Sequence, residues 1–556
     1  MTKPRADATP AQAALARSTR LVDALRQSGP WPHPVQEPIG LVETHISWVL
    51  LTGPYAYKLH KPVNLGFLDF TGLEQRLHDC HEELRLNLRL SQDLYLGLVA
   101  VVDSPAGLRV VEASEEPGSA PLPGGELPLE VGLRMRQFPQ EALLPAALAR
   151  GAIDGKQLDA LALDLARFHQ RAAVAPADGA YGTPAAVLQP VRDNITALEP
   201  RLPAHAHPLL EQVRRWSERC FADIRPLLEQ RLAAGRVREC HGDLHLGNML
   251  LLDGRIQVFD CLEFSPSLRW IDVISDMAFL VMDLEERGAP VLANRLLNAW
   301  LGETGDYDGL RLWCWYSSYR AMVRAKVAAL SGDIPGALAY LNRAHQASQP
   351  GSPRLLLCHG LSGSGKSHLS RQLAGPLGAI LLRSDVERKR RFAQQPGMPP
   401  AAATDPASDT APNNSNLYAA SVSDALFLEQ LPQLAEGLLG VGFSVIVDAT
   451  FLRAAYRAAM EAVAERCAVP LVILDLQVPR PLLERRISGR QRAGGDPSDA
   501  DLAVLARQLL CQEPLTAAEQ GRSIAIGAEP ELDAILAAIR ASTLPFAFNG
   551  SCQLDD

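Results

Sequence analysis

The hydrophobic pattern of the first half of the chain changes from short apolar runs to helical spacing. Two such runs, Ile46 to Thr52 and Tyr55 to Pro62, flank a Gly-Pro turn, which predicts a β-hairpin. A helix is expected over 73–90 and a strand over 131–138, and from Gln157 onward apolar residues recur with a helical period. The pattern therefore predicts a small β-rich lobe followed by a helical lobe.

The last third of the chain alternates strands and helices instead. Helices are expected directly after Gly365 and near Asp424 to Leu439. Between and after them we expect strands at Arg354 to His359, Ala379 to Leu382, Ser444 to Asp448 and Leu471 to Gln477. This order predicts a parallel α/β sheet.

The chain divides most simply into two domains. Its 556 residues exceed one ordinary core, and the polar segment 346–353 with its Pro and Gly residues is the best linker candidate. We therefore predict domains over 1–350 and 351–556, with residues 1–30 as a helical or disordered lead-in. The stretch 393–416 is rich in Pro, Ala, Asp and Asn, which predicts a flexible insertion in the second domain.

Composition narrows the class of protein. With 47% hydrophobic and 21% charged residues the chain is expected to fold, and a net charge of −9 makes nucleic acid and anionic lipid unlikely partners. The nine cysteines contain no CxxC pair, which favours reduced thiols. Since no export signal and no apolar run of about 18 residues is present, we expect a cytoplasmic protein without a membrane partner.

The first chemical motif, HGDLHLGN, begins at His241, and a strand-like run ends at Asp260 shortly after it. In-line phosphoryl transfer needs a carboxylate that orients the attacking hydroxyl, and oxygen ligands for a Mg²⁺ ion that bridges the nucleotide phosphates. Asp243 suits the first role as the catalytic base. Asn248 and Asp260 suit the second role as metal ligands.

Together with Lys58 on an early strand, this motif resembles the aminoglycoside phosphotransferase and choline kinase branch of the protein-kinase-like fold. The resemblance covers roughly residues 40 to 345 and implies a bilobal domain that binds ATP. It implies that Lys58 contacts the α/β-phosphates and pairs with a helix carboxylate, Glu83 or its rival Glu82. It also implies that Met135 and nearby backbone hold the adenine.

Several residues near this motif have competing interpretations. Asp272 and Asp276 match the spacing of the family's GDPxxDLA segment, yet they would equally cap a helix or pair with Arg269. His241 is expected to be structural rather than a metal ligand, and His169 is expected to be a packed core histidine.

The sequence also departs from the family pattern. No GxGxxG loop precedes Lys58, and the segment His45 to Trp48 is the only candidate to replace it. Glu263 follows Asp260 closely and fits either a second metal-shell residue or a surface charge.

The second motif, GLSGSGKS, follows an apolar run and precedes a helical pattern, as a P-loop does. Its glycines let backbone N–H groups wrap phosphates at a helix N-terminus, its lysine reaches the β/γ-phosphates and its last serine binds Mg²⁺. The predicted nucleotide-binding set is Gly360, Ser362, Gly363, Ser364, Gly365, Lys366 and Ser367, with Ser367 also a metal ligand.

Further along, FSVIVDATF ends a strand in Asp448, a candidate Walker B ligand for Mg²⁺ or else a helix cap. Over residues 354–545 the chain resembles P-loop kinases of the polynucleotide kinase, gluconate kinase and chloramphenicol phosphotransferase type. That resemblance implies that Asp385 receives the proton of the substrate hydroxyl, and that Arg490 and Arg492 belong to a lid that closes on the transferring phosphoryl group.

The order of the two domains resembles bacterial fusions of an aminoglycoside phosphotransferase-like domain with an AAA-type P-loop domain. We therefore expect a kinase that uses ATP and Mg²⁺ to phosphorylate a small hydroxylated molecule, with two ATP-binding domains. One alternative is a P-loop ATPase switch with a nucleotide-sensing kinase-like domain. A second is a nucleic-acid end kinase, which the acidic charge balance disfavours.

Overall fold

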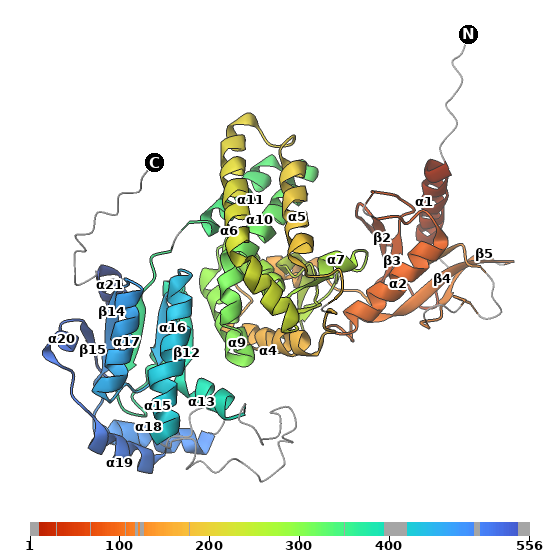
Figure 1. Cartoon of the computed structure of the whole chain (residues 1–556). Coiled ribbons are helices and arrows are strands. Elements are labelled where there is room, and N and C mark those ends of the chain that lie inside the picture. The colour runs from red at the N-terminus through yellow and green to blue at the C-terminus, as the bar shows by residue number, and fades with distance from the viewer. Residues whose placement is uncertain are drawn as a thin grey trace. The chain divides into compact units, whose positions relative to one another are not determined.

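A computed structural model gives the fold (Figure 1). It describes residues 10–28, 31–66, 68–105, 107–116, 120–122, 127–176, 178–349, 351–393, 420–493 and 501–542. The chain forms two compact units. The first comprises Met1–Asp193 and Arg225–Leu280, and the second comprises Asn194–Ile224 and Val281–Asp556. The predicted domain boundary near residue 350 stays a prediction, and the packing divides the chain elsewhere.

The first unit contains a six-stranded antiparallel sheet in the order β1-β2-β3-β6-β4-β5. Its strands are β1 (Gly40–Glu43), β2 (Ser47–Leu51), β3 (Tyr55–His60), β4 (Tyr95–Ser104), β5 (Gly107–Glu112) and β6 (Glu130–Arg136). Helix α1 (Pro10–Ser28) packs on one face through Val22 and Leu25, and α2 (Leu73–Asn87) packs on the other through Cys80 and Leu84. Because side chains alternate along β3, Lys58 lies on the face that α2 covers.

The rest of the first unit is mostly helical, with two small antiparallel ribbons. Its helices are η2 (Gln140–Ala142), α3 (Leu144–Ala149), α4 (Gly155–Arg171), η4 (Leu246–Asn248) and α7 (Pro266–Arg269). The ribbons pair β8 (Met249–Leu252) with β9 (Arg255–Val258), and β7 (Val237–Glu239) with β10 (Trp270–Asp272). The division between the units passes through α5 (Pro184–Leu198), α6 (His207–Ala233) and α8 (Val273–Glu286).

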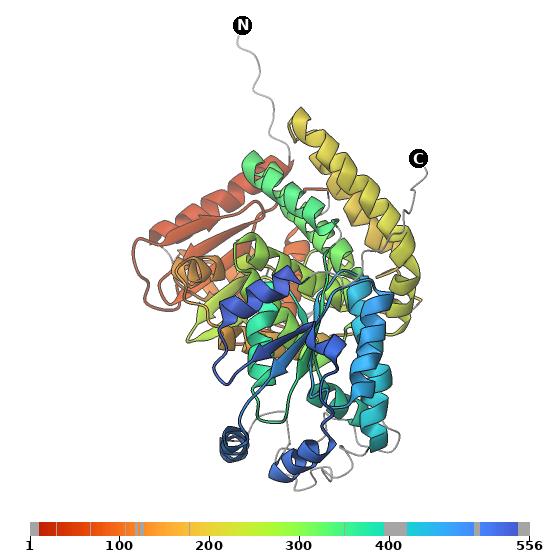
Figure 2. The same cartoon turned by 90° about the vertical axis from the view of Figure 1, so that its left-hand side faces the viewer.

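The second unit contains a parallel sheet in the order β12-β13-β11-β14-β15. Its strands are β11 (Leu355–His359), β12 (Ile380–Arg383), β13 (Val445–Asp448), β14 (Leu471–Leu476) and β15 (Ser523–Ile526). Helices α12 (Lys366–Leu377) and α21 (Leu532–Ala541) cover one face, and α16 (Leu431–Gly440) and α17 (Ala454–Arg466) cover the other (Figure 2). The strand-helix alternation thus produces the predicted parallel sheet.

The remaining helices of this unit flank the sheet or precede it in the chain. They are η3 (Ala204–Ala206), α9 (Pro290–Thr304), η5 (Asp308–Leu312), α10 (Trp313–Leu330), α11 (Ile334–Ala347), α13 (Ser384–Ala393), α15 (Ala420–Ala425), η7 (Leu426–Gln430), α18 (Arg480–Ala493), α19 (Leu502–Cys511) and α20 (Ala517–Gln520). Residues 394–416 of the predicted insertion lie outside the described residues. Among the described helices, none is long and apolar enough to cross a membrane.

Candidate functional sites

Lys58 lies at the centre of a buried charge cluster in the first unit. Its Nζ is 2.8 Å from Glu83 Oε1 and 3.0 Å from Asp260 Oδ1. Burial opposes the charge on Lys58, but Asp260, Glu83 and Glu263 outweigh it and raise the pKa of the ammonium well above its usual value. Of the two rival partners it is thus Glu83 that pairs with Lys58, while Glu82 binds Arg85.

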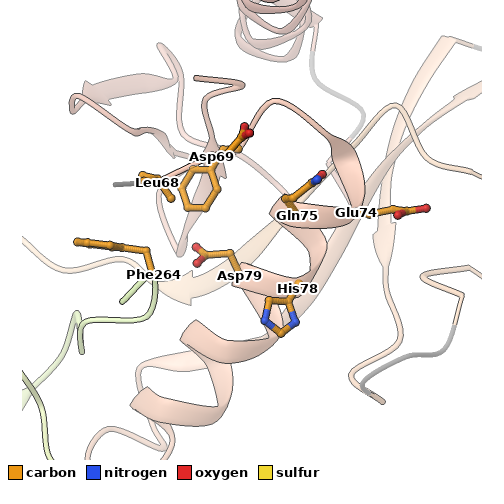
Figure 3. A pocket seen from close by; sticks show the side chains of 8 residues that line it. Leu68, Asp69, Glu74, Gln75, His78, Asp79 and Phe264 are labelled. Carbon is orange, nitrogen blue, oxygen red and sulfur yellow. The ribbon is translucent and has the colours of Figure 1, made fainter. Parts of the chain in front are cut away.

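A second group of buried ionisable side chains adjoins this pair. His60 Nε2 lies 3.1 Å from Asp79 Oδ2 and 3.6 Å from Glu83 Oε2. Asp79 lines a cavity of about 400 Å³ between α2 and the segment 68–70, where its carboxylate points toward Phe264 (Figure 3). Burial and the nearby Glu83 carboxylate raise the pKa of Asp79 to about 8, so this carboxyl is largely protonated at neutral pH.

The HGDLHLGN segment forms a tight loop, and the carboxylate of Asp276 stabilises its backbone. The backbone N–H groups of His241 and Gly242 each donate to the Asp276 carboxylate at 3.0 Å, and Gly242 adopts a φ of 86°. Asn248 Nδ2 donates to Asp243 Oδ2 at 3.0 Å. This bond brings the predicted base and a predicted metal ligand together, and it leaves the amide oxygen of Asn248 as the atom suited to a metal.

The two histidines of competing interpretation are both structural. His241 Nε2 bonds the carbonyl of Phe259 at 3.0 Å, and burial lowers the pKa of its ring. His169 is buried and lies 3.3 Å from Asp276 Oδ2. Both rings therefore support the loop rather than face a substrate.

The two aspartates of the DVISD segment have different partners. Asp272 forms a two-point ion pair with Arg231, at 2.7 and 2.8 Å, and also accepts from the backbone of Ile274. Asp276 binds the loop as described. The proposed pairing of either residue with Arg269 is wrong for the described structure, because Arg269 binds Glu239 and Glu82.

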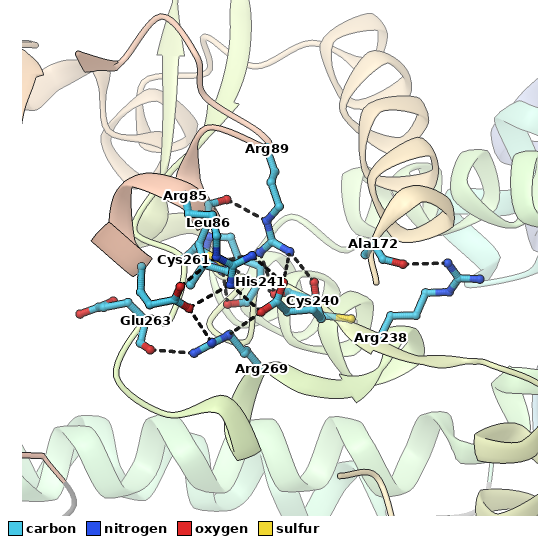
Figure 4. Close-up of polar contacts among 12 residues, drawn as sticks. Arg85, Leu86, Arg89, Ala172, Arg238, Cys240, His241, Cys261, Glu263 and Arg269 are labelled. Atoms are coloured by element: carbon cyan, nitrogen blue, oxygen red, sulfur yellow. Dashed lines mark hydrogen bonds and ion pairs between the residues drawn. The ribbon is translucent and has the colours of Figure 1, made fainter. Parts of the chain in front are cut away.

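An arginine network that the sequence did not reveal joins α2 to the loop (Figure 4). Arg89 donates to the carbonyls of Glu239 and Cys240, and Arg269 donates to the Glu239 carboxylate and the Glu263 carbonyl. These residues are far apart in the chain, and only folding brings them together. The network fixes the distance between the helix that carries Glu83 and the strand that leads into Asp243.

Two further predictions for this unit can be placed. Met135 is buried in β6, paired with Ala56 of β3, in the sheet that carries Lys58. The turn between β1 and β2 overlaps the segment His45 to Trp48, which was proposed to replace a Gly-rich loop. There Thr44 Oγ1 accepts from the backbone of Ile46 and Ser47, so a side chain stabilises the turn.

In the second unit the P-loop lies between β11 and α12. Gly360, Gly363 and Gly365 have φ values of 147°, 83° and 100°, which only glycine adopts easily. Lys366 Nζ donates to the carbonyls of Gly360 and Leu361 at 3.0 and 2.7 Å. The loop therefore curls around its own lysine, and Ser367 follows in the first turn of α12.

Three other predicted residues of this site influence the pKa of Lys366. Burial lowers the pKa of Lys366, Asp448 and Asp385 counteract that effect, and Arg490 adds to it, so all three side chains act on the ammonium electrostatically. Asp448 is buried and 3.3 Å from Arg383 Nε, an interaction that the sequence did not predict. The side chain of Arg492 lies outside what the structure describes.

A cavity of about 310 Å³ adjoins the P-loop. Arg486 lines it and donates to the carbonyls of Gly363, Ser364 and Ala528, which ties α18 to the loop. The lid prediction named Arg490 and Arg492, and it did not name Arg486. The cavity extends from the phosphate loop toward residues 526–530, at the end of β15.

Comparison with known proteins matches two stretches of the chain to models of protein families. Residues 2–313, more than half of the chain, match the model of the phosphotransferase enzyme family. The chain belongs to this family. Residues 355–515 match the model of an AAA domain.

Two mycobacterial relatives align with most of the chain. Uncharacterized proteins of Mycobacterium tuberculosis and Mycobacterium bovis are each 32% identical over 492 residues, which covers 85% of this chain and 90% of theirs.

Two solved structures are similar to parts of the chain at low sequence identity and low TM-score. A wild-type aminoglycoside 2′-phosphotransferase-IIIa in its GDP complex has 14% identity and a TM-score of 0.33, covering 61% of this chain and 99% of its own. A sugar kinase from Janibacter has 19% identity and a TM-score of 0.24, covering 34% and 92%.

The predicted fold class is confirmed. The chain combines a phosphotransferase-type kinase-like region with a P-loop region built on a parallel α/β sheet. These families support a kinase-type function that uses ATP on a small molecule. The roles of the individual site residues stay predictions.

Proposed function

We propose that the chain is a phosphotransferase that uses Mg²⁺ and ATP to phosphorylate a hydroxyl group of a small molecule, and that it binds ATP at two sites. The observation that carries the proposal is the repetition of one chemical arrangement. In each unit a buried lysine lies beside carboxylates that are suited to Mg²⁺, Lys58 with Asp260 and Lys366 with Asp448.

At the first site the position of each residue suits a different role in phosphoryl transfer. Lys58, held by Glu83, would bind the α/β-phosphates, and Asn248 and Asp260 offer the oxygen ligands that Mg²⁺ prefers. Asp243, with a side chain 36% exposed, is open to an incoming hydroxyl. When bound, Mg²⁺-ATP supplies the phosphoryl group and neutralises charge on its oxygens.

At the second site the backbone contributes more. The P-loop N–H groups and Lys366 would hold the phosphates, and Ser367 and Asp448 would hold the metal ion. Asp385 lies in the first turn of α13, two residues after Arg383, which is paired with Asp448 at the ends of β12 and β13, and it would serve as the base. The cavity beside Arg486 is suited to the nucleoside.

The proposal is tested on the full chain with a library of hydroxylated metabolites, by mass spectrometry for the ATP-dependent gain of one phosphate. Asp243→Asn and Asp385→Ala, alone and combined, assign any product to a site. Asp159→Asn, at an exposed position of α4, and Asp533→Asn, at an exposed position of α21, are the matched controls.

We expect at least one phosphorylated product that is lost in one of the two site variants and kept in both controls. A chain that hydrolyses ATP without any acceptor, and whose hydrolysis responds to a protein partner, would replace the proposal with an ATPase switch. Phosphorylation of nucleic-acid ends alone would replace it with an end kinase.

A further inference from the structure

Helix α9 belongs by sequence to the phosphotransferase match, since that match extends to residue 313. By packing, however, α9 belongs to the unit that holds the P-loop. It lies against β12, the edge strand of the parallel sheet, and against α12, the helix that follows the P-loop. The unit that holds the P-loop thus includes a helix from the stretch that matches the phosphotransferase family.

The side chain of Asn298 completes the edge of the sheet. Its Oδ1 accepts from the backbone N–H of Leu381 at 2.7 Å, and its Nδ2 donates to the carbonyl of Ala379 at 2.9 Å. These are the two bonds that a neighbouring parallel strand would make with the residues on either side of Ile380. Asn294 adds a second donor to the Ala379 carbonyl at 3.1 Å.

The contact with α12 is equally close. A Cβ atom at Gly375 would lie only 2.6 Å from Val291 Cγ1 and 3.4 Å from its Cα, so only glycine allows α9 to approach this near. The contact lies nine residues after Lys366 on the same helix. Helix α9 is therefore packed against the element that carries the phosphate lysine.

The segment after α9 holds α13 through a buried acidic residue. Glu387, which is 1% exposed, accepts from Tyr307 Oη at 3.2 Å and pairs with Arg390 of its own helix. Arg390 in turn donates to the carbonyl of Gly302 at 2.6 Å and lies against Gly305, where a Cβ would be 2.6 Å from its Nε. Two elements of the phosphotransferase segment thus converge on one turn of α13.

That turn is next to the predicted base. Asp385 lies two residues before Glu387, and the start of α13 is fixed separately, since Ser384 Oγ donates to the carbonyl of Asp448 at 3.2 Å. A helix held at its start and again one turn further on presents its first-turn side chains in one direction. We propose that residues 290–312 form a positioning surface that holds β12 and α13 and so orients Asp385 toward the acceptor of the P-loop site.

The proposal rests on the function proposed above, in which Asp385 receives the proton of the acceptor. It makes Asn298 and Tyr307 positioning residues, which act through β12 and α13 and touch neither nucleotide nor acceptor. Their loss should misplace Asp385 while the phosphate loop stays intact. A misplacement of about 1 Å is enough to lower a rate roughly 10²-fold.

The test compares Tyr307→Phe and Asn298→Leu with Asn342→Leu in the full chain. Tyr307→Phe removes only the hydroxyl, and Asn298→Leu replaces the amide oxygen and nitrogen by two methyl groups on the same branched frame. Asn342 is the matched control, because it is exposed on α11 and its amide bonds only the Leu338 carbonyl of its own helix. Each variant is measured by amide hydrogen exchange over 380–393, by fluorescent-ATP affinity, and by steady-state kinetics with the acceptor found in the library.

We expect Tyr307→Phe and Asn298→Leu to raise exchange over 380–393 by about tenfold and to lower kcat/KM for the acceptor by about 10- to 100-fold. Affinity for ATP should stay within about twofold, and Asn342→Leu should resemble the unaltered chain.

Unchanged exchange in both variants, or raised exchange with unchanged acceptor kinetics, would overturn the positioning role. An equal loss of ATP affinity and acceptor turnover would also overturn it, because it would indicate general damage to the unit. If the unaltered chain phosphorylates no acceptor, the proposed function fails, and the exchange measurement alone then decides whether residues 290–312 hold α13.

Discussion

The two candidate sites are built from different kinds of groups. In the first unit, side chains from distant segments meet, so that Lys58, Glu83 and Asp260 come from a strand, a helix and a loop. In the second unit, consecutive backbone groups between β11 and α12 form most of the site, and glycines with positive φ shape it.

The difference shows which part of each site is sensitive to change. A site assembled from charged side chains depends on every partner, because an unpaired buried charge is costly. A site formed by a backbone loop depends on its conformation more than on any single side chain. We therefore expect the first site to depend on its charged side chains, and the second site to be sensitive to substitutions of glycine as well.

The largest expected effect separates two carboxylates of the first site. Asp243→Asn should lower transfer by roughly 10²- to 10⁴-fold, the usual scale of general-base catalysis, and leave nucleotide affinity nearly unchanged. Asp260→Asn should instead weaken Mg²⁺-dependent nucleotide binding. Calorimetry and acceptor kinetics on each variant distinguish these results. The same phenotype in both variants would contradict the division of roles.

An effect of similar size is expected from two residues of the second site. Asp385→Ala should spare ATP binding and lower acceptor phosphorylation by roughly 10²- to 10⁴-fold, with less effect on ATP hydrolysis, which uses water. Lys366→Ala should weaken ATP binding about tenfold or more, because it removes a charged hydrogen-bond donor. Full transfer by Asp385→Ala would show that another group is the base.

A moderate effect is expected from the backbone of the P-loop. At Gly363 the φ is 83°, and a Cβ would lie 3.0 Å from the Leu483 carbonyl. Gly363→Ala should therefore weaken nucleotide affinity roughly tenfold and destabilise the unit by about 1–2 kcal/mol. Gly437→Ala is the control, since its Cβ would meet nothing within 4 Å in α16 and should stabilise the helix slightly. Equal effects would refute the backbone argument.

The smallest expected effect concerns the pH dependence of stability in the first unit. The Asp79 carboxyl keeps its proton up to about pH 8 in the folded chain but has a usual pKa of 3.8. The folded state therefore binds more protons between these values, and this contribution to the free energy of unfolding falls as the pH rises through them. Asp79→Asn should therefore gain stability relative to the unaltered chain as the pH rises from 5 to 9, measured by urea denaturation.

A residue lining the same cavity provides the control. Asp69 is exposed, and its hydrogen bonds from Thr71 lower its pKa. Its contribution to stability is thus already complete above its usual pKa and does not change between pH 5 and pH 9. Asp69→Asn should shift stability equally at both pH values, and an Asp79→Asn variant that behaved in the same way would contradict the raised pKa.

The sequence was most informative where a site is local. The P-loop and the HGDLHLGN loop are each formed by one short segment, so the spacing of their residues already indicates their geometry. Lys58 and Glu83 were also found, because a strand and a helix of regular period bring them to one face. Strand β15 was missed, because it is an edge strand with small residues beside its isoleucines and lacks a run of large apolar residues.

The sequence was least informative where a partner comes from a distant element. Asp272 binds Arg231 rather than a neighbour, and nothing in the spacing of these two residues indicates it. The same applies to Arg269 with Glu239, and to Arg383 with Asp448. Each pair depends on the packing of whole helices and strands, which local patterns do not determine.

The edge of the parallel sheet also bears on how such a gene can be inherited. Strand β12 is bonded on one side by β13 and on the other by two asparagines from α9. A gene that carried only the P-loop stretch would encode a sheet whose edge strand β12 is unpaired and able to bond with a strand of another chain. Separating the two stretches by recombination would therefore be expected to leave the product with an uncovered sheet edge.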